Sequence, residues 1–244
     1  SCIFACRLEI TGVWTDPKLH RMNDSRGAIG VLRTSPPGTH GVGSMELFFD
    51  LVYVFTIIQL SHLLLHDLTW HGAAETLVLF AAMWWGWNYT AWAMNWLDPD
   101  RPVVRVLLAV LMLLALGMAI SLPEAFTTAA PFFVGAYVLF QLGRSAFMVL
   151  AFRGSVMSRN YAQLLAWSGI SAVFWIAGAI APEEFRLALW TLAVLIDYAA
   201  PGLGFWLPGV GRSAMSSWPL DEAHLAERNR LIFIIALGES ILIL

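Results

Sequence analysis

Apolar blocks about 20 residues long recur along the chain, and short polar segments separate them. A helix rises about 1.5 Å per residue, so about 20 apolar residues cross a hydrocarbon core of about 30 Å. We expect six complete membrane spans, at residues 47–65, 72–93, 103–120, 130–152, 163–181 and 186–207. A seventh apolar run, at 231–244, is too short to finish a crossing. The pattern predicts an all-α, polytopic transmembrane helix bundle with six complete spans plus a truncated seventh.

Composition supports this class, since 59% of the residues are hydrophobic and 13% are charged, against about 25% charged in a soluble domain. We expect a transmembrane helical domain at residues 45–244. Because the final apolar run has no polar exit, this domain is expected to be the N-terminal part of a longer protein. Residues 1–44 form a polar tail that we expect to be disordered. Both cysteines, Cys2 and Cys6, lie in the tail, and no second pair completes a metal site.

Basic residues indicate the orientation of the bundle. Cytoplasmic loops of membrane proteins collect Lys and Arg. Of the 14 Lys and Arg residues, twelve fall in alternate connecting segments, including the tail and the segment with Arg228 and Arg230. One, Arg186, falls on the other side, and Arg144 lies inside a span. The asymmetry supports the number of spans and predicts a multi-pass membrane protein with a cytoplasmic N-terminus.

Four ionisable residues fall within the predicted spans, in the inner half of the bilayer. Counting rise per residue places Asp50 about 5 Å, Arg144 about 10 Å, Glu239 about 12 Å and Asp197 about 14 Å above the inner boundary. Charges at membrane depth are expensive unless they are paired or accompanied by an ion. We therefore expect Arg144 to pair with one or two carboxylates, and the remaining acid to bind a proton or a small cation.

Two other interpretations of these charges stay open. They could form ion pairs that fix helix register and do nothing else. Asp50 and Glu46 could instead be interfacial residues near a helix N-terminus, where the helix dipole favours an acid.

Aromatic and amide side chains provide weaker candidates for ligand contact. Trp85, Tyr89, Trp92 and Trp96 share one helix face, and Asn88 lies beside it. Such a wall could hold an organic cation or a flat ligand. Tryptophan belts at a membrane interface explain the same pattern.

The amide of Gln59 lies deep in the first span and is a further candidate for facing a ligand. His62 and His66 are four residues apart near the end of that span, which is a spacing that can bind zinc, although histidines also suit a wet interface.

Catalytic constellations are not evident. No Ser-His-Asp set can be placed at one depth, and no glycine-rich phosphate loop is present. We therefore expect no enzymatic activity, no cofactor and no nucleic-acid partner, and we expect the lipid bilayer as the main partner. The sequence leaves the oligomeric state open.

Several segments together resemble the bacterial low temperature requirement A (LtrA) family. They are Glu46-Leu-Phe-Phe-Asp-Leu-Val-Tyr-Val-Phe55, Gln59-Leu-Ser-His62, Trp87-Asn-Tyr-Thr-Ala-Trp92, Asn95-Trp-Leu-Asp-Pro-Asp-Arg-Pro102, Pro123-Glu-Ala-Phe126, Gln141-Leu-Gly-Arg144 and Leu237-Gly-Glu-Ser240. The resemblance runs collinearly from about Met45 to the last residue. It implies a polytopic inner-membrane protein associated by name with growth at low temperature, with no established substrate.

The motifs of that family include Glu46, Asp50, Arg144 and Glu239, whereas Asp197 rests on depth alone. A separate likeness links Phe48-Phe49-Asp50 to the Phe-Ser-Asp motif of a class of organellar and bacterial potassium channels, although the serine is missing here.

We expect a transporter-like protein that handles protons or small cations through its polar cluster. The alternatives are a non-transporting membrane scaffold or sensor linked to low-temperature growth, and a cation channel.

Overall fold

The computed structural model describes residues 31–32, 43–213, 218 and 222–243, without the side chains of residues 222 and 239–243. Within these ranges the chain forms seven α-helices and one short 3₁₀ helix, so the all-α prediction is confirmed there. The elements are α3 (Ser44–His66), α4 (Trp70–Met94), α5 (Pro102–Ser121), η1 (Leu122–Glu124), α6 (Ala130–Ala151), α7 (Val156–Ile180), α8 (Glu183–Gly202) and α9 (Glu222–Ile243). The predicted tail lies almost entirely outside the described residues.

Four described helical segments are long and apolar enough to cross a membrane. They are Ser44–His66, Pro102–Glu124, Ala130–Ala151 and Val156–Ile180. Length and composition therefore do not confirm the predicted number of six complete spans. The predicted spans at 72–93 and 186–207 correspond to α4, which contains five Trp residues, and to α8, which carries three acidic residues and one Arg. Such residues lower the mean hydropathy of a helix without preventing its burial against other helices.

Helix boundaries differ from the predicted spans where polar residues extend a helix. α7 begins at Val156 because the side chain of Ser155 caps it by accepting a hydrogen bond from the Ser158 N–H (3.3 Å). α8 ends earlier than predicted, at Gly202, directly after Pro201. α9 begins at Glu222, about two turns before the predicted start at 231. Its first half is polar, so a hydropathy pattern does not detect it.

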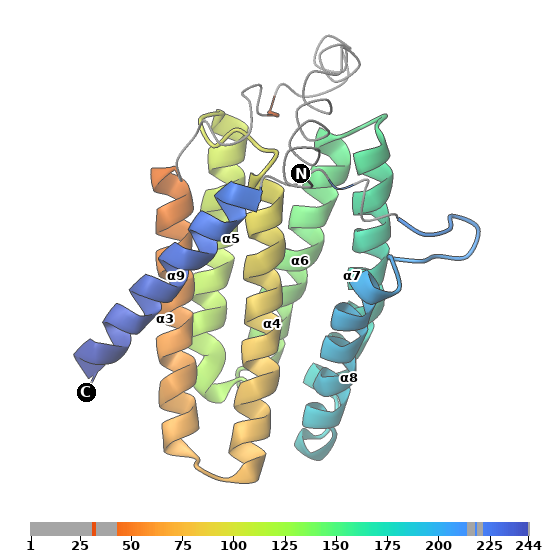
Figure 1. Ribbon diagram of the computed structural model, residues 1–244. Coiled ribbons are helices and arrows are strands. Elements are labelled where there is room, and N and C mark those ends of the chain that lie inside the picture. Colours follow the sequence, from red (N-terminus) through yellow and green to blue (C-terminus); the bar gives the residue numbers. More distant parts are fainter. Residues whose placement is uncertain (1–30, 33–42, 214–217, 219–221, 244) are drawn as a thin grey trace, which may run out of the picture.

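The helices α3 to α8 run alongside one another, and α9 crosses obliquely over α3 (Figure 1). Helices that follow one another in sequence pack together from α5 to α8, while α3 packs against both α4 and α5. Contact between α4 and α8 joins the early helices to the late ones. The largest buried side chains are aromatic, including Trp87, Trp175 and Trp190. This packing encloses several polar side chains, and the completely buried Arg228 and Arg144 mark two of the polar regions.

Candidate functional site

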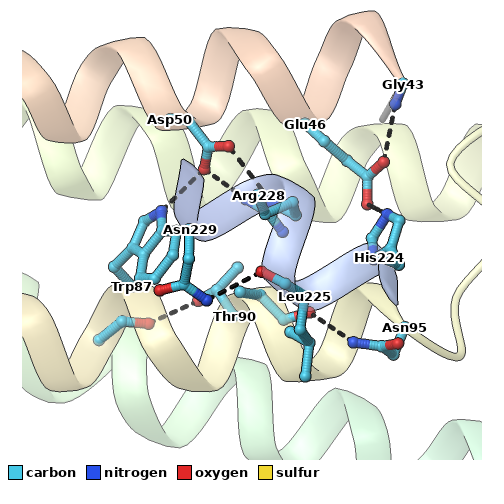
Figure 2. A network of polar contacts seen from close by, with 12 residues as sticks. Gly43, Glu46, Asp50, Trp87, Thr90, Asn95, His224, Leu225, Arg228 and Asn229 are labelled. Atoms are coloured by element: carbon cyan, nitrogen blue, oxygen red, sulfur yellow. Dashed lines mark hydrogen bonds and ion pairs between the residues drawn. The ribbon is translucent and has the colours of Figure 1, made fainter. Parts of the chain in front are cut away.

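The first polar region lies where α9 crosses α3. Glu46 and Asp50 are one helical turn apart on α3, and His224 and Arg228 are one turn apart on α9. The crossing brings each acid opposite a basic side chain (Figure 2). We call these four residues the α3–α9 contact. Each of the four side chains is at most 3% exposed, so both pairs are buried.

Asp50 is held by three donors. The Arg228 guanidinium donates from Nε to Oδ2 at 3.3 Å and from Nη2 to Oδ1. The Trp87 indole donates from Nε1 to Oδ1 at 2.7 Å. The guanidinium carbon of Arg228 also lies 5.7 Å from the centre of the Trp87 ring and 6.0 Å from that of Phe49. The carboxylate and its cation are therefore fixed in place by hydrogen bonds and aromatic contacts.

Glu46 has two roles at the start of α3. Its Oε2 accepts a hydrogen bond from the Gly43 N–H at 2.9 Å, which caps the helix. Its Oε1 lies 3.4 Å from Nε2 of His224. A protonated His224 makes this contact an ion pair. One carboxylate thus links the first turn of α3 to the first turn of α9.

This pairing differs from one expectation. We expected Arg228 in a cytoplasmic loop, and it is instead completely buried against Asp50. Glu46 and Asp50 are also completely buried in the bundle, and Glu46 lies in the first turn of α3, so their interfacial interpretation stays a prediction. Glu46 and Asp50 are four residues apart, and so are His224 and Arg228. This matching spacing is the sequence signal that could have predicted the contact.

The second polar region surrounds Arg144 of α6, which is completely buried. Its Nη1 donates to the Gly86 carbonyl oxygen (2.9 Å) and to Oγ1 of Thr90 (3.2 Å) on α4. Its Nη2 donates to Oε1 of Gln141, one turn earlier on α6, at 2.6 Å. All three acceptors are neutral, so hydrogen bonds solvate the guanidinium without cancelling its charge.

Arg144 differs from the expectation that it pairs with a carboxylate. Among the side chains that the structure describes, no carboxylate oxygen lies within 4.0 Å of its guanidinium, and its Nε has no hydrogen-bond partner. Instead four of the five tyrosines of the sequence lie near its guanidinium, whose carbon is 5.7 Å from the centre of the Tyr89 ring. This tyrosine cluster draws one residue from each of α3, α4, α6 and α7: Tyr53, Tyr89, Tyr137 and Tyr161.

Asp197 of α8 is 3% exposed and borders the same interior. Ser171 and Trp175 on α7 and Tyr137 on α6 lie near its carboxylate, although the Ser171 hydroxyl donates to the Ser168 carbonyl oxygen. Its Oδ2 makes no hydrogen bond to the described residues, and neither does Nε1 of Trp175. The Gln141 side chain donates from Nε2 to the Tyr137 hydroxyl at 3.0 Å. Gln141 and Tyr137 therefore lie between the arginine and the aspartate.

We call Arg144, Gln141, Tyr137 and Asp197 the interior network. Of the four charged residues that sequence placed in the inner half of the bilayer, two belong to it. Asp50 is instead paired with Arg228, and the side chain of Glu239 lies outside the described part of the chain.

Tyr53 lies between the two polar regions. It lies near both Arg144 and Asp50, and its hydroxyl has no hydrogen-bond partner among the described residues. A Cβ atom added at Gly86 would come within 2.9 Å of this hydroxyl. Glycine at that position therefore lets α4 approach the Tyr53 side chain closely while its carbonyl oxygen accepts from Arg144.

The aromatic candidates pack against other side chains. The Trp85 ring lies 4.4 Å from that of Tyr89 and 4.8 Å from that of Tyr198, measured between centroids. Trp85 and Tyr89 are buried, whereas Asn88 and Gln59 are partly exposed. The aromatic face thus forms part of the junction between α4 and α8, and its contact with a ligand stays a prediction.

The histidine candidates lie at the far end of α3. His62 and His66 are exposed, and no group of three or more potential metal-ligating residues occurs among the described residues. His71 lies nearby in sequence, 3.5 Å from Glu75, and both line a cavity of 290 Å³ at this end of the bundle. The histidines and the interior network therefore lie on different parts of the bundle.

Comparison with known proteins identifies the family. A sequence model of the bacterial low temperature requirement A protein matches residues 41–244. An uncharacterized protein of Rhizobium meliloti (strain 1021) is 43% identical over 199 residues, which are 81% of this chain and 49% of the relative. The chain thus spans about half the length of the curated relative it matches. No solved structure matches. Because the family model matches most of its length, the chain belongs to the bacterial low temperature requirement A (LtrA) family of membrane proteins.

Proposed function

We propose that this LtrA-family segment belongs to a transporter-like protein that handles protons or small cations through the interior network. The observation that carries the proposal is a buried arginine and a buried aspartate in one interior without a direct ion pair. Ionisable residues inside a membrane bundle commonly mark ion or proton pathways.

The proposed topology has α3 to α8 as six complete spans and α9 as the start of a seventh, in the bacterial inner membrane. The uneven distribution of Lys and Arg supports a cytoplasmic N-terminus. The packing of α4 and α8 against neighbouring helices supports their inclusion, because helices covered by protein need less apolar surface than helices that face lipid.

The charge of Asp197 explains how the interior network can bind a proton or a small cation. A directly paired carboxylate is neutralised by its partner and gains little from a further cation. Asp197 has an oxygen atom with no hydrogen bond, while the guanidinium of Arg144 is held off by Gln141 and Tyr137. The charge of Asp197 is therefore only partly compensated, and a proton or cation can be taken up and released.

The α3–α9 contact favours a second candidate, a non-transporting membrane scaffold or sensor linked to growth at low temperature. Its two buried pairs are the kind of contact that fixes helix register. The same contact argues against the cation-channel alternative, because Asp50 is already engaged by Arg228 and Trp87.

Flux measurements on the full-length protein in lipid vesicles separate these functions. We expect Arg144→Ala and Asp197→Asn to insert near the wild-type level and to lose most proton or cation flux. Exposed residues provide matched controls: Arg153→Ala and Asp100→Asn should leave insertion and flux unchanged. Normal insertion with unchanged flux in both interior variants would exclude the transport function and favour the scaffold.

A further inference from the structure

We propose that the ion taken up at Asp197 is a proton rather than a metal cation, and that Gln141 is a positioning residue for this site through Tyr137. This inference rests on the proposed function and names the ion that it handles.

The groups near Asp197 suit a carboxyl group better than a metal ion. Hard cations such as Ca²⁺ and Mg²⁺ take about six or more oxygen ligands. Near Asp197 lie two hydroxyl groups, of Ser171 and Tyr137, and the indole N–H of Trp175, which can only donate. The Tyr137 oxygen already accepts from Gln141, so few lone pairs are left for a metal.

The charges around Asp197 also favour a proton over a metal cation. The titratable groups near it are Tyr89 of α4, Tyr137 and Arg144 of α6, and Tyr198 of α8 itself. None of these neighbouring groups, among the described residues, is a second carboxylate. A metal cation would therefore be repelled by the positive charge of Arg144, and only one carboxylate would offset that repulsion. A proton instead forms a covalent O–H bond and needs no further ligand.

Arg144 sets the direction of the hydrogen-bond chain. Because it donates to Oε1 of Gln141, the amide must present Nε2 to the Tyr137 hydroxyl. The Tyr137 oxygen accepts that bond, which leaves its own hydrogen available to another acceptor. Tyr137 is one of the polar groups near the Asp197 carboxylate, so the guanidinium leaves a phenol donor available to that carboxylate without touching it.

The step is a simple protonation. One Asp197 carboxylate oxygen takes up a proton, an O–H bond forms, and the negative charge disappears. Tyr137 keeps its own proton throughout. Release reverses these changes, so no other reactant is required.

The test uses the full-length protein in vesicles, with two separate readouts. Proton flux is followed with a trapped pH-sensitive dye under a pH gradient. Na⁺ and K⁺ fluxes are followed with ion-sensitive dyes at equal pH on both sides. We expect proton flux without Na⁺ or K⁺ flux, a loss of at least about tenfold in Asp197→Asn, and partial retention in Asp197→Glu, since only the latter keeps a titratable group.

Gln141→Leu tests the positioning role. It keeps Asp197 but removes the donor that orients Tyr137, so we expect the proton flux to fall by about twofold to tenfold and its pH midpoint to rise. The exposed Asp100→Asn serves as the control. An unshifted pH midpoint in Gln141→Leu would overturn the role of Gln141.

The other outcomes separate the inference from the function beneath it. Na⁺ or K⁺ flux at equal pH that disappears in Asp197→Asn would overturn the proton assignment and leave the transport function standing. Absence of every flux in the wild type would overturn both. If Asp197→Asn fails to insert, infrared spectra of the wild type and of Asp197→Glu decide the matter. A titrating carboxylic-acid band that changes frequency between them supports the assignment, and its absence overturns it.

Discussion

Two completely buried arginines of this bundle, Arg144 and Arg228, have opposite surroundings. Arg228 contacts the carboxylate of Asp50 directly, and the α3–α9 contact neutralises its charge. Arg144 contacts a carbonyl, a hydroxyl and an amide oxygen, and the aspartate of its interior lies beyond Gln141 and Tyr137. A buried guanidinium can therefore hold two helices together or leave a nearby acid only partly compensated, depending on what its donors reach.

Removal of Asp50 should have the largest effect on stability. Asp50→Ala leaves Arg228 buried without its partner, which should destabilise the protein by about 3–5 kcal/mol. Thermal unfolding in detergent and the level of membrane insertion would measure the loss. In an Arg228→Met background the same change should cost much less, because no unpaired charge is left. A loss below about 1 kcal/mol for the single variant would contradict a direct buried pair.

Replacement of Arg144 should cost less stability than loss of Asp50. Arg144→Met leaves only neutral acceptors unpaired, so we expect a loss of about 1–3 kcal/mol together with loss of flux. The same unfolding and flux assays apply. A stability loss equal to that of Asp50→Ala would mean that Arg144 is directly paired after all, and would remove the contrast between the two regions.

Glycine positions near Arg144 test how closely α4 approaches Tyr53. In Gly86→Ala the new Cβ would lie 2.9 Å from the Tyr53 hydroxyl and 3.3 Å from Cε1 of Phe140. We expect a loss of about 1–2 kcal/mol from this overpacking. Gly143, beside Arg144 on α6, is the matched control because a Cβ there meets nothing within 4 Å. Unfolding midpoints should show Gly143→Ala unchanged or slightly stabilised; equal effects at both sites would refute the close approach.

Glu46 should give the smallest effect, and it separates two contributions to the α3–α9 contact. Glu46→Gln keeps an oxygen that can accept from the Gly43 N–H but removes the charge opposite His224. Glu46→Ala removes both. We expect Glu46→Ala to be less stable than Glu46→Gln by about 0.5–1 kcal/mol, the contribution of a helix cap. Equal unfolding midpoints for the two variants would show that the cap contributes nothing.

The sequence allowed the prediction of those properties that depend on the composition of a single helix, such as its position along the chain. Apolar block length placed the helices, and rise per residue singled out Arg144 and Asp197, which the fold brings into one interior. The same reasoning misassigned Arg228 to a loop, because the polar first half of α9 looks like a connection until its partner helix is known.

Sequence alone thus determined the class of the protein, its family and the helices that carry Asp50, Arg144 and Asp197, since hydropathy and motif order are local properties of the chain. Only the tertiary structure decided which charges meet. Asp50 and Arg228 are 178 positions apart, and their contact depends on the angle at which α9 crosses α3. Whether Arg144 reaches a carboxylate likewise depends on how α6 is rotated towards α4 and α8. Crossing angle and rotation arise from side-chain packing between helices, and a linear pattern does not contain them.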